Sequence, residues 1–305
     1  MKRYILKRIG QALITIIGIS MVVFLLTHLT GDPVALMAPQ NATLEDLQRI
    51  RIEYGFDKPI YVQYWKYISN VVQGDFGKSL QVNIPAIELF FDRFPNTVKL
   101  AIVSMIFALL FGLPTGIFSA VRVGRRFDSF GKVFALMGQA LPNFWVGIML
   151  IILFSTSLKW LPTSGMGGWQ YYIMPAFTMG WYPMAAITRL TRSAMLDVLD
   201  AEYIKMARIK GVSELWVILK HAFKNASAPV LTMSALQFVA MINGAMIIET
   251  VFNWPGLGRL IVSSIFGRDY PVVQMCVLIS SSFFVFANLL VDILYAYLDP
   301  RIRYQ

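Results

Sequence analysis

Side chains that could support catalysis or bind a metal are few in this chain and far apart. It has two histidines, His28 and His221, and one cysteine, Cys276, which excludes a disulfide framework and argues against a metal site built from these residues. The sequence has no Gly-x-Ser-x-Gly or His-Glu-x-x-His motif and no Walker-type lysine loop. We therefore expect no catalytic residue, no metal site, no cofactor bound by this chain, and no ATP hydrolysis by the chain alone.

Three polar side chains inside apolar segments are candidates for a pathway or gate: Asn243, Glu249 and Asp292. A carboxylate at membrane depth costs about 2.5–3.5 kcal/mol on insertion scales, so such residues are functional candidates by default. For Glu249, which closes an apolar segment, simple hydration near the membrane surface is the favoured alternative. For Asp292 a helix–helix contact is an equal alternative, and for Asn243-Gly244 close helix packing is favoured.

Composition places the chain in a membrane. Hydrophobic residues make up 57% of the 305 residues and charged residues only 14%, and a soluble domain has nearly twice that charged share. The net charge of +10 would suggest a nucleic-acid partner for a soluble protein. Here the cations cluster beside apolar segments, which is the positive-inside pattern of membrane proteins. We expect lipid around this chain and no nucleic acid.

Six apolar segments predict transmembrane helices, because at about 1.5 Å per residue they approach or exceed the roughly 30 Å of a bilayer core. Segments that would face the cytoplasm contain seventeen of the 27 Lys and Arg residues, which places both termini inside. Pro114 predicts a kink in the second span, Leu141-Pro142 an interruption of the third, and Pro175 with Pro183 a break in the fourth. The predicted spans are Ile9–Leu29, Val98–Val121, Val133–Leu158, Tyr172–Ile187, Val230–Val251 and Val272–Leu298.

The predicted domain division has three parts. Residues 1–30 form an N-terminal transmembrane helix, residues 31–96 form an external segment, and residues 97–305 form a core with five transmembrane helices. A second external excursion, Asn253–Tyr270, contains a short apolar piece of its own. The external segment is interpreted either as a packed cap or as a docking surface.

Two helices are predicted in the external segment. Thr43 is expected to be the N-cap of a helix to Tyr54, with Asp46 three residues later as an acidic variant of the capping box. The second apolar-periodic stretch, Val62–Val72, is expected to place Tyr64, Trp65 and Tyr67 near a membrane surface.

A polar stretch of nearly thirty residues, Glu202–Pro229, separates two apolar segments. The pattern predicts a short helix, a break at Gly211, and a second helix from the N-cap Ser213 to Phe223, with Pro229 at the start of the next apolar segment. An ordinary cytoplasmic loop is the alternative. Connecting loops are usually shorter, so a hairpin that docks on a soluble partner is favoured.

Three stretches match a known family: YILKRIGQALITIIGISMVVFLLTHLTGDP, YGFDKPIYVQYWKYISNVVQGDFGKSL and ETVFNWPGLGRL. Over essentially its whole length the chain resembles the permease subunit of ABC importers of the dipeptide, oligopeptide and nickel group, in particular the first of two paired permeases. Lys205 and Met206 replace the Glu and first Ala of the general Glu-Ala-Ala-x-x-x-Gly pattern, as is usual in the peptide group. Residues 200–229 resemble the coupling loop, with the implied contact residues Glu202, Tyr203, Ala207, Gly211, Ala222, Asn225 and Pro229.

The resemblance implies the type I ABC importer fold, all-α and multi-pass in the bacterial inner membrane. It implies that the coupling helix sits in a cleft of an ATP-binding subunit, where Gly211 permits the turn and Ala207 keeps the contact surface flat. The implied partners are two ATP-binding subunits, which bind ATP and Mg, a second homologous permease in a heterodimer, and an extracytoplasmic substrate-binding protein. The binding protein would touch residues 31–96 and 253–270.

The cargo implied by the family is a dipeptide or oligopeptide. Glutathione, nickel complexes and oligosaccharides are the alternatives within the same architecture. The alternative from a different class is a channel or secondary carrier that works without ATP. In all of these alternatives the chain is a transport protein, and it is not expected to be an enzyme.

Overall fold

The fold is known from a computed structural model, which describes residues 2–29, 34 and 43–298. In these residues the regular secondary structure is helical, and the one β-type pairing is an isolated bridge between Lys78 and Pro85. The prediction of an all-α membrane protein is confirmed. A helix satisfies its backbone hydrogen bonds within one segment, which is what a lipid environment demands.

The chain divides into two compact units, Met1–Asn96 with Gly256–Gln305, and Thr97–Pro255. The predicted division into 1–30, 31–96 and 97–305 was made on membrane topology, which these units do not test.

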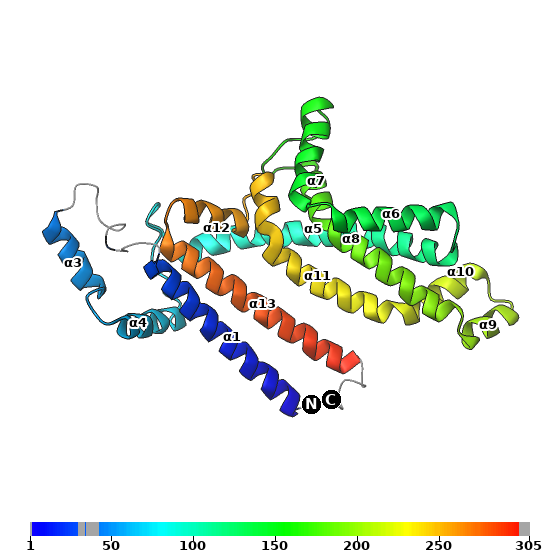
Figure 1. The fold of residues 1–305 in the computed structure, drawn as a ribbon, viewed down its shortest axis with the longest axis horizontal. Coiled ribbons are helices and arrows are strands. Elements are labelled where there is room, and N and C mark those ends of the chain that lie inside the picture. Colours follow the sequence, from blue (N-terminus) through cyan, green and yellow to red (C-terminus); the bar gives the residue numbers. More distant parts are fainter. Residues whose placement is uncertain (1, 30–33, 35–42, 299–305) are drawn as a thin grey trace. The chain divides into compact units, whose positions relative to one another are not determined.

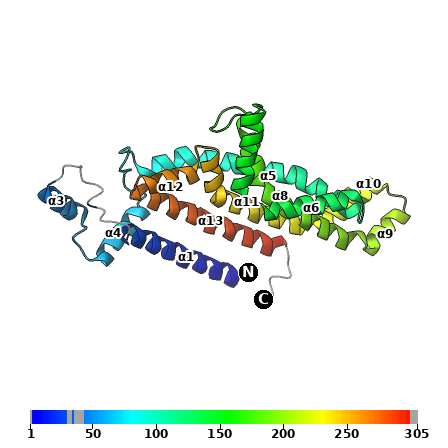
Figure 2. The same cartoon turned by 45° about the horizontal axis from the view of Figure 1, so that its top comes forward.

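In the first unit, α1 (Lys2–Leu29) lies beside α13 (Tyr270–Leu298), as Figures 1 and 2 show. The helix α4 (Ile60–Val72) contacts α1, where the Tyr64 hydroxyl lies 2.9 Å from the Ser20 hydroxyl. Phe24 of α1 meets the rings of both Tyr64 and Tyr67, with centroids 5.4 and 5.6 Å away. These two tyrosines therefore pack on a helix, whereas Trp65 is exposed as expected for a surface residue.

The helix α3 (Leu44–Tyr54) has the predicted N-terminus. The Asp46 backbone N–H donates to the Thr43 hydroxyl oxygen at 3.3 Å, and the Thr43 backbone N–H donates to the Asp46 carboxylate at 3.1 Å. This reciprocal pair is the capping box that the sequence predicted.

A buried carboxylate joins two turns of the first unit that are far apart in sequence. Asp269, at the corner between α12 (Leu257–Phe266) and α13, accepts hydrogen bonds from the Ser79 hydroxyl and from the Leu80 backbone N–H. The two segments are 190 residues apart in sequence. The short apolar piece predicted within Asn253–Tyr270 is confirmed as α12.

The second unit is built around α8 (Gln170–Leu199), which packs against α6 (Arg126–Ala140), α7 (Asn143–Leu150) and α11 (Lys224–Val251). Small residues let α5 (Ala86–Val121) come close as well. A methyl group at Gly180 would lie only 2.7 Å from the Ser104 carbonyl oxygen of α5. The remaining elements of this unit are the π-helical turn η1 (Ile151–Ser157), α9 (Glu202–Ile209), α10 (Glu214–Trp216) and a second π-helical turn, η2 (Val217–Phe223).

The predicted interruption at Leu141-Pro142 is confirmed. Leu141 is extended, at φ −87° and ψ 131°, because the ring of a following proline disfavours the helical conformation. The chain direction bends by 105° at this break, so α7 turns away from the direction of α6 (Figures 1 and 2).

Three other predictions about helix limits are wrong. The helix α5 begins at Ala86, twelve residues before the predicted span. It includes Pro114, where the kink stays a prediction. The helix α8 is continuous through Pro175 and Pro183 and ends at Leu199 rather than Ile187. Proline is tolerated in such a helix where neighbouring segments surround it, and both prolines of α8 are buried.

The count of six spans is not settled by helix composition. Among the described residues, four helical stretches are long and apolar enough to cross a membrane. They lie in α1, in α5, in the stretch from Glu214 to Val251 and in α13. A fifth span results if the two helices on either side of Leu141-Pro142 are counted as one bent span. The predicted fourth span, α8, is not among these helices, although it is 30 residues long. Half of its residues are buried against protein, and these include threonines. Six spans with both ends inside therefore stay a prediction.

The close α5–α8 contact gives a stability prediction. We expect Gly180→Ala to lower the free energy of unfolding by about 1–3 kcal/mol, because the new methyl group would overlap the Ser104 carbonyl. The matched control is Gly244→Ala in α11, where a methyl group meets nothing within 4 Å. Thermal unfolding of the purified protein in detergent measures both. Equal melting temperatures for the two variants would contradict the assigned contact.

Candidate functional site

The polar stretch forms the predicted helix–glycine–helix hairpin. α9 ends before Gly211, which has the left-handed φ of 78° that glycine adopts without strain. The Gly211 N–H donates to the Arg208 carbonyl at 3.0 Å, and the Val212 N–H donates to the Ala207 carbonyl at 3.2 Å. Ser213 stands at the predicted N-cap position with an extended backbone, but its side chain makes no capping hydrogen bond.

Polar contacts hold the two arms of this hairpin together. Arg208 and Glu214 form a two-point ion pair across the turn, at 2.8 and 3.2 Å, and this pairing raises the pKa of Arg208. Because both side chains are about half exposed, the pair contributes no more than about 1 kcal/mol. The Asn225 side-chain amide donates to the Tyr203 hydroxyl at 3.1 Å, which joins α9 to the start of α11.

The hairpin has a buried side and an exposed side. Its buried side packs against α5 and α8 through Ile204, Ala207, Val217, Ala222 and Ala226, around Met195. Its exposed side is apolar, with Tyr203, Met206, Ile209, Leu215, Trp216 and Leu219 open to the surroundings (α9 and α10 in Figure 1).

The positions of the seven predicted coupling residues follow from these two sides. Glu202, Tyr203, Gly211, Asn225 and Pro229 are exposed, whereas Ala207 and Ala222 are buried. The Ala207 methyl group lies beneath the hairpin and packs α9 onto the unit. Its expected role in keeping the contact surface flat stays a prediction.

The second arm does not end at Phe223. Glu214 to Val251 is one continuous helical stretch of 38 residues, with the wider π-helical turn η2 inside it. Pro229 lies within α11 and does not start it, contrary to the prediction. The exposed arm of the hairpin is thus directly continuous with a membrane-length helix.

Glu249 is fully buried, not hydrated as the favoured interpretation held. Its carboxylate accepts a hydrogen bond of 2.6 Å from the Thr97 hydroxyl of α5, which offsets part of the cost of burying it. Asn243 donates to the Val239 carbonyl of its own helix. A methyl group at Gly244 would meet nothing within 4 Å in this chain, so the predicted close helix packing there is not found within the chain and stays a prediction. The side chain of Asp292 lies outside the described residues.

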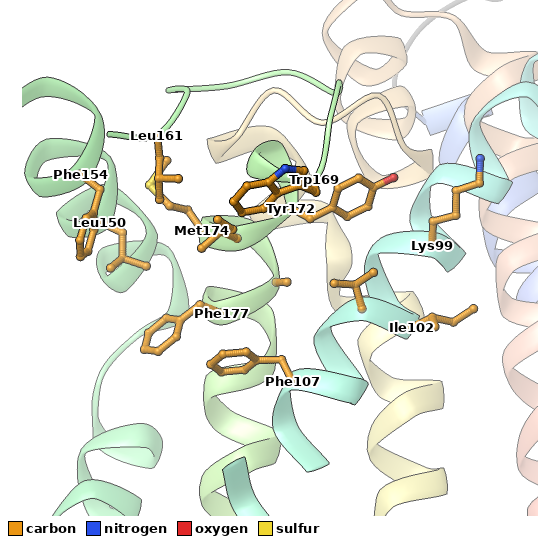
Figure 3. Close-up of a pocket in the computed structure, with 13 residues that line it drawn as sticks. Lys99, Ile102, Phe107, Leu150, Phe154, Leu161, Trp169, Tyr172, Met174 and Phe177 are labelled. Atoms are coloured by element: carbon orange, nitrogen blue, oxygen red, sulfur yellow. The ribbon is translucent and has the colours of Figure 1, made fainter. Parts of the chain in front are cut away.

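The second unit contains a cavity of about 1020 Å³ lined by α5, α7, η1, α8 and the loop before α8. Figure 3 shows Phe107 and Phe177 in its lower part and Trp169 and Tyr172 in its upper part, with Lys99 on α5 as its one charged lining residue. A peptide here would lose water from its amide groups and find few partners. Of the predicted pathway residues whose side chains the structure describes, Asn243 and Glu249, neither lines this cavity.

A buried ion cluster at the N-terminal end of α6 was not predicted from the sequence. Asp128 has no exposed side-chain surface and accepts from Arg192 of α8 at 2.7 and 3.1 Å, from the Lys132 ammonium at 2.9 Å and from the Gly124 N–H at 3.0 Å. Asp128 and Lys132 are four residues apart, which is a detectable pattern on a helix. Arg192 is 64 residues away, and no sequence signal pairs it with Asp128.

Comparison with known proteins assigns the class. Residues 112–304 match the family described as the binding-protein-dependent transport system inner membrane component, and residues 1–101 match the N-terminal family of such membrane components. The chain belongs to this family, and is thus a membrane permease of a binding-protein-dependent ABC importer, located in the bacterial inner membrane.

Its relatives include the glutathione transport system permease protein GsiC of Salmonella paratyphi A and of Escherichia coli K12. Each is 45% identical over 306 residues, covering all of both chains. Among solved structures, the MetNI methionine ABC transporter in an inward-facing conformation matches 70% of this chain and 97% of its own, with a TM-score of 0.56 at 15% identity. An amino acid ABC transporter with histidines matches 69% and 94%, also at 0.56. At such identities these structures support the fold alone.

The buried Glu249 gives the next prediction. We expect Thr97→Val to destabilise the protein by about 1–3 kcal/mol, because it removes a hydroxyl donor from a buried carboxylate. Thr97→Ser keeps the hydroxyl and is the matched control. Melting temperatures in detergent measure the difference, and a valine variant as stable as the serine variant would show that this hydrogen bond contributes nothing.

Proposed function

We propose that this chain is one of two paired permeases of an importer for short peptides, with glutathione, itself a tripeptide, as the first cargo to test. The observation that supports this most is the 45% identity to glutathione permeases over the full length of both chains. The expectation from sequence was peptide in general, with glutathione as an alternative. Because the relatives are glutathione permeases, we propose glutathione ahead of the other candidate cargoes.

The energy for transport comes, in this proposal, from two separate ATP-binding subunits that hold ATP and Mg. The exposed apolar side of the hairpin supports docking of such a soluble partner, since side chains such as Ile209 and Trp216 gain from leaving water. Glu202, Tyr203 and Gly211 lie on the exposed side, and Asn225 and Pro229 at its base complete the contact region.

Coupling would work mechanically. The underside of the hairpin is packed on Met195 near the end of α8, and its second arm is continuous with α11. A displacement of the hairpin by its partner therefore moves both helices together. We propose that this movement alternates the pathway between inward and outward openings.

A second permease and an extracytoplasmic binding protein complete the proposed assembly. The cavity of this chain is apolar and offers little to a polar cargo, so the polar pathway is proposed to form against the second, homologous permease. The binding protein would deliver cargo to residues 31–96 and 253–270. Asn243 and Glu249 are bonded within this chain, which supports structural rather than cargo-binding roles for them.

Uptake measurements test the cargo. Cells lacking this chain are compared with cells in which it is restored, using labelled glutathione, dipeptides and oligopeptides. We expect uptake of glutathione to fall on deletion and return on complementation. Unchanged uptake of all three in a strain without other peptide importers would contradict peptide cargo, and chelated nickel and oligosaccharides would then be tested.

The coupling hairpin gives a sharper test. We expect Gly211→Asp to abolish transport while the protein remains inserted in the membrane, because it puts a charge where the partner docks. Gly211→Asn is the matched control, since Asn tolerates the left-handed conformation about as well as Asp and the position has open space. We expect the Asn variant to keep part of its uptake. Normal uptake by the Asp variant would make the coupling assignment wrong, and flux without ATP in vesicles would favour a channel or carrier.

A further inference from the structure

The cluster of Asp128, Lys132 and Arg192 lies close to the part of α8 on which the hairpin packs. Arg192 lies one turn before Met195, the buried α8 residue against which the hairpin packs. Asp128 lies in the first turn of α6, and α6 leads through Leu141-Pro142 to α7. The ion pair therefore connects α8, close to the residue on which the hairpin packs, to α6, the helix that leads to the bend.

The geometry of this pair is that of a firm connection. The Arg192 guanidinium meets both carboxylate oxygens of Asp128, at 2.7 and 3.1 Å, and such two-point pairs fix orientation as well as distance. The Asp128 side chain is 0% exposed and that of Arg192 is 22% exposed, so water screens the pair little. Removing Arg192 would leave a buried charge without its main partner.

The rest of the α6–α8 contact is equally close. A methyl group at Gly138 of α6 would lie 2.6 Å from the Ala185 methyl of α8, and the Phe134 and Trp181 rings meet edge to face at 4.5 Å. Interlocked surfaces of this kind do not slide freely. The two helices are therefore joined by packing along their length and by charge at the hairpin end.

The contact of α5 with these two helices differs. Ser119 of α5 lies against α6 and Thr191 of α8 lies against α5, and among the described residues neither buried hydroxyl has a hydrogen-bond partner. A buried polar group without a partner costs free energy in this arrangement. Thr188 of α8 donates a hydrogen bond of 3.3 Å to the Gly112 carbonyl of α5, so α5 is held to α8 by packing and neutral hydrogen bonding. Among the described residues no ion pair joins α5 to α6 or α8, in contrast to the ion cluster between α6 and α8.

We propose that the Asp128–Arg192 pair is a coupling latch, which makes α6 follow α8 when the ATP-binding partner displaces the hairpin. Asp128 and Arg192 are positioning residues in this role, and neither needs to touch cargo or nucleotide. The latch transmits the movement of the hairpin to the bend at Leu141-Pro142 and so to α7. This inference rests on the proposed coupling function of the hairpin.

The test is the amount of peptide imported per ATP hydrolysed by the complete complex in proteoliposomes. We use labelled glutathione, or another labelled peptide that the wild-type complex imports. With Asp128→Asn or Arg192→Gln we expect continued ATP hydrolysis but roughly a fivefold or larger loss of import per ATP. The double variant should lose no more than either single variant, because the connection is already cut.

Two further variants separate a latch from a support. Lys132→Gln removes a cation from the same carboxylate but cuts no connection to α8, because Lys132 belongs to α6 and is 54% exposed, so we expect import per ATP within twofold of wild type. Arg192→Lys keeps the charge and should restore part of the ratio. Where a single variant fails to assemble, the neutral double variant leaves no buried charge and is measured instead.

Several outcomes would overturn the latch. It is wrong if import and ATP hydrolysis fall in proportion, so that their ratio stays at the wild-type value, because a purely structural support would behave in that way. It is also wrong if Lys132→Gln lowers the ratio as much as Arg192→Gln. A wild-type complex that hydrolyses ATP but imports nothing would instead overturn the proposed function, and the latch with it.

Discussion

The burial of α8 is the constraint on which the second unit depends. Half of its 30 residues are buried against neighbouring helices. The approach of α5 and α6 is so close that a methyl group at Gly180 of α8 would overlap α5, and one at Gly138 of α6 would overlap α8. A helix enclosed by protein needs no continuous apolar surface, so it accommodates threonines, two prolines and a charged C-terminal end. The hairpin that follows α8 is consequently attached directly to the most enclosed helix of the unit.

Local signals in the sequence predicted much of this structure. The capping box of Thr43 and Asp46, the turn at Gly211 and the break at Leu141-Pro142 depend on a few neighbouring residues, and all three are where the sequence placed them. The apolar pattern predicted only Tyr172–Ile187 of α8, because hydropathy measures how well a segment suits lipid, whereas this helix mainly contacts protein. It also missed the first turns of α5, which carry charged residues such as Glu88 ahead of the apolar stretch.

The parts that sequence could not predict are pairings between distant positions. Thr97 and Glu249 are 152 residues apart, and Asp128 and Arg192 are 64 apart. Each residue alone has an ordinary explanation, as a span-end carboxylate or as a topology-setting arginine. Only the packing of α5, α6, α8 and α11 brings these residues together. The periodicity of a helix indicates which of its faces is buried, but not which residue of a distant helix a given side chain will contact. The same holds for the cavity, whose aromatic lining residues are indistinguishable from core residues in the sequence.

The distribution of polar groups bears on how this permease would transport the proposed peptide cargo. The carboxylate of Glu249 and the amide of Asn243 are engaged within the chain, and the cavity of about 1020 Å³ has one charged lining residue, Lys99. A peptide stripped of water in those surroundings would lose several hydrogen bonds without replacement. A pathway along which peptides move quickly must instead stay hydrated or offer exchangeable partners. In the proposed assembly that surface lies between two permeases, so the interior of each chain does not have to offer polar partners to the cargo.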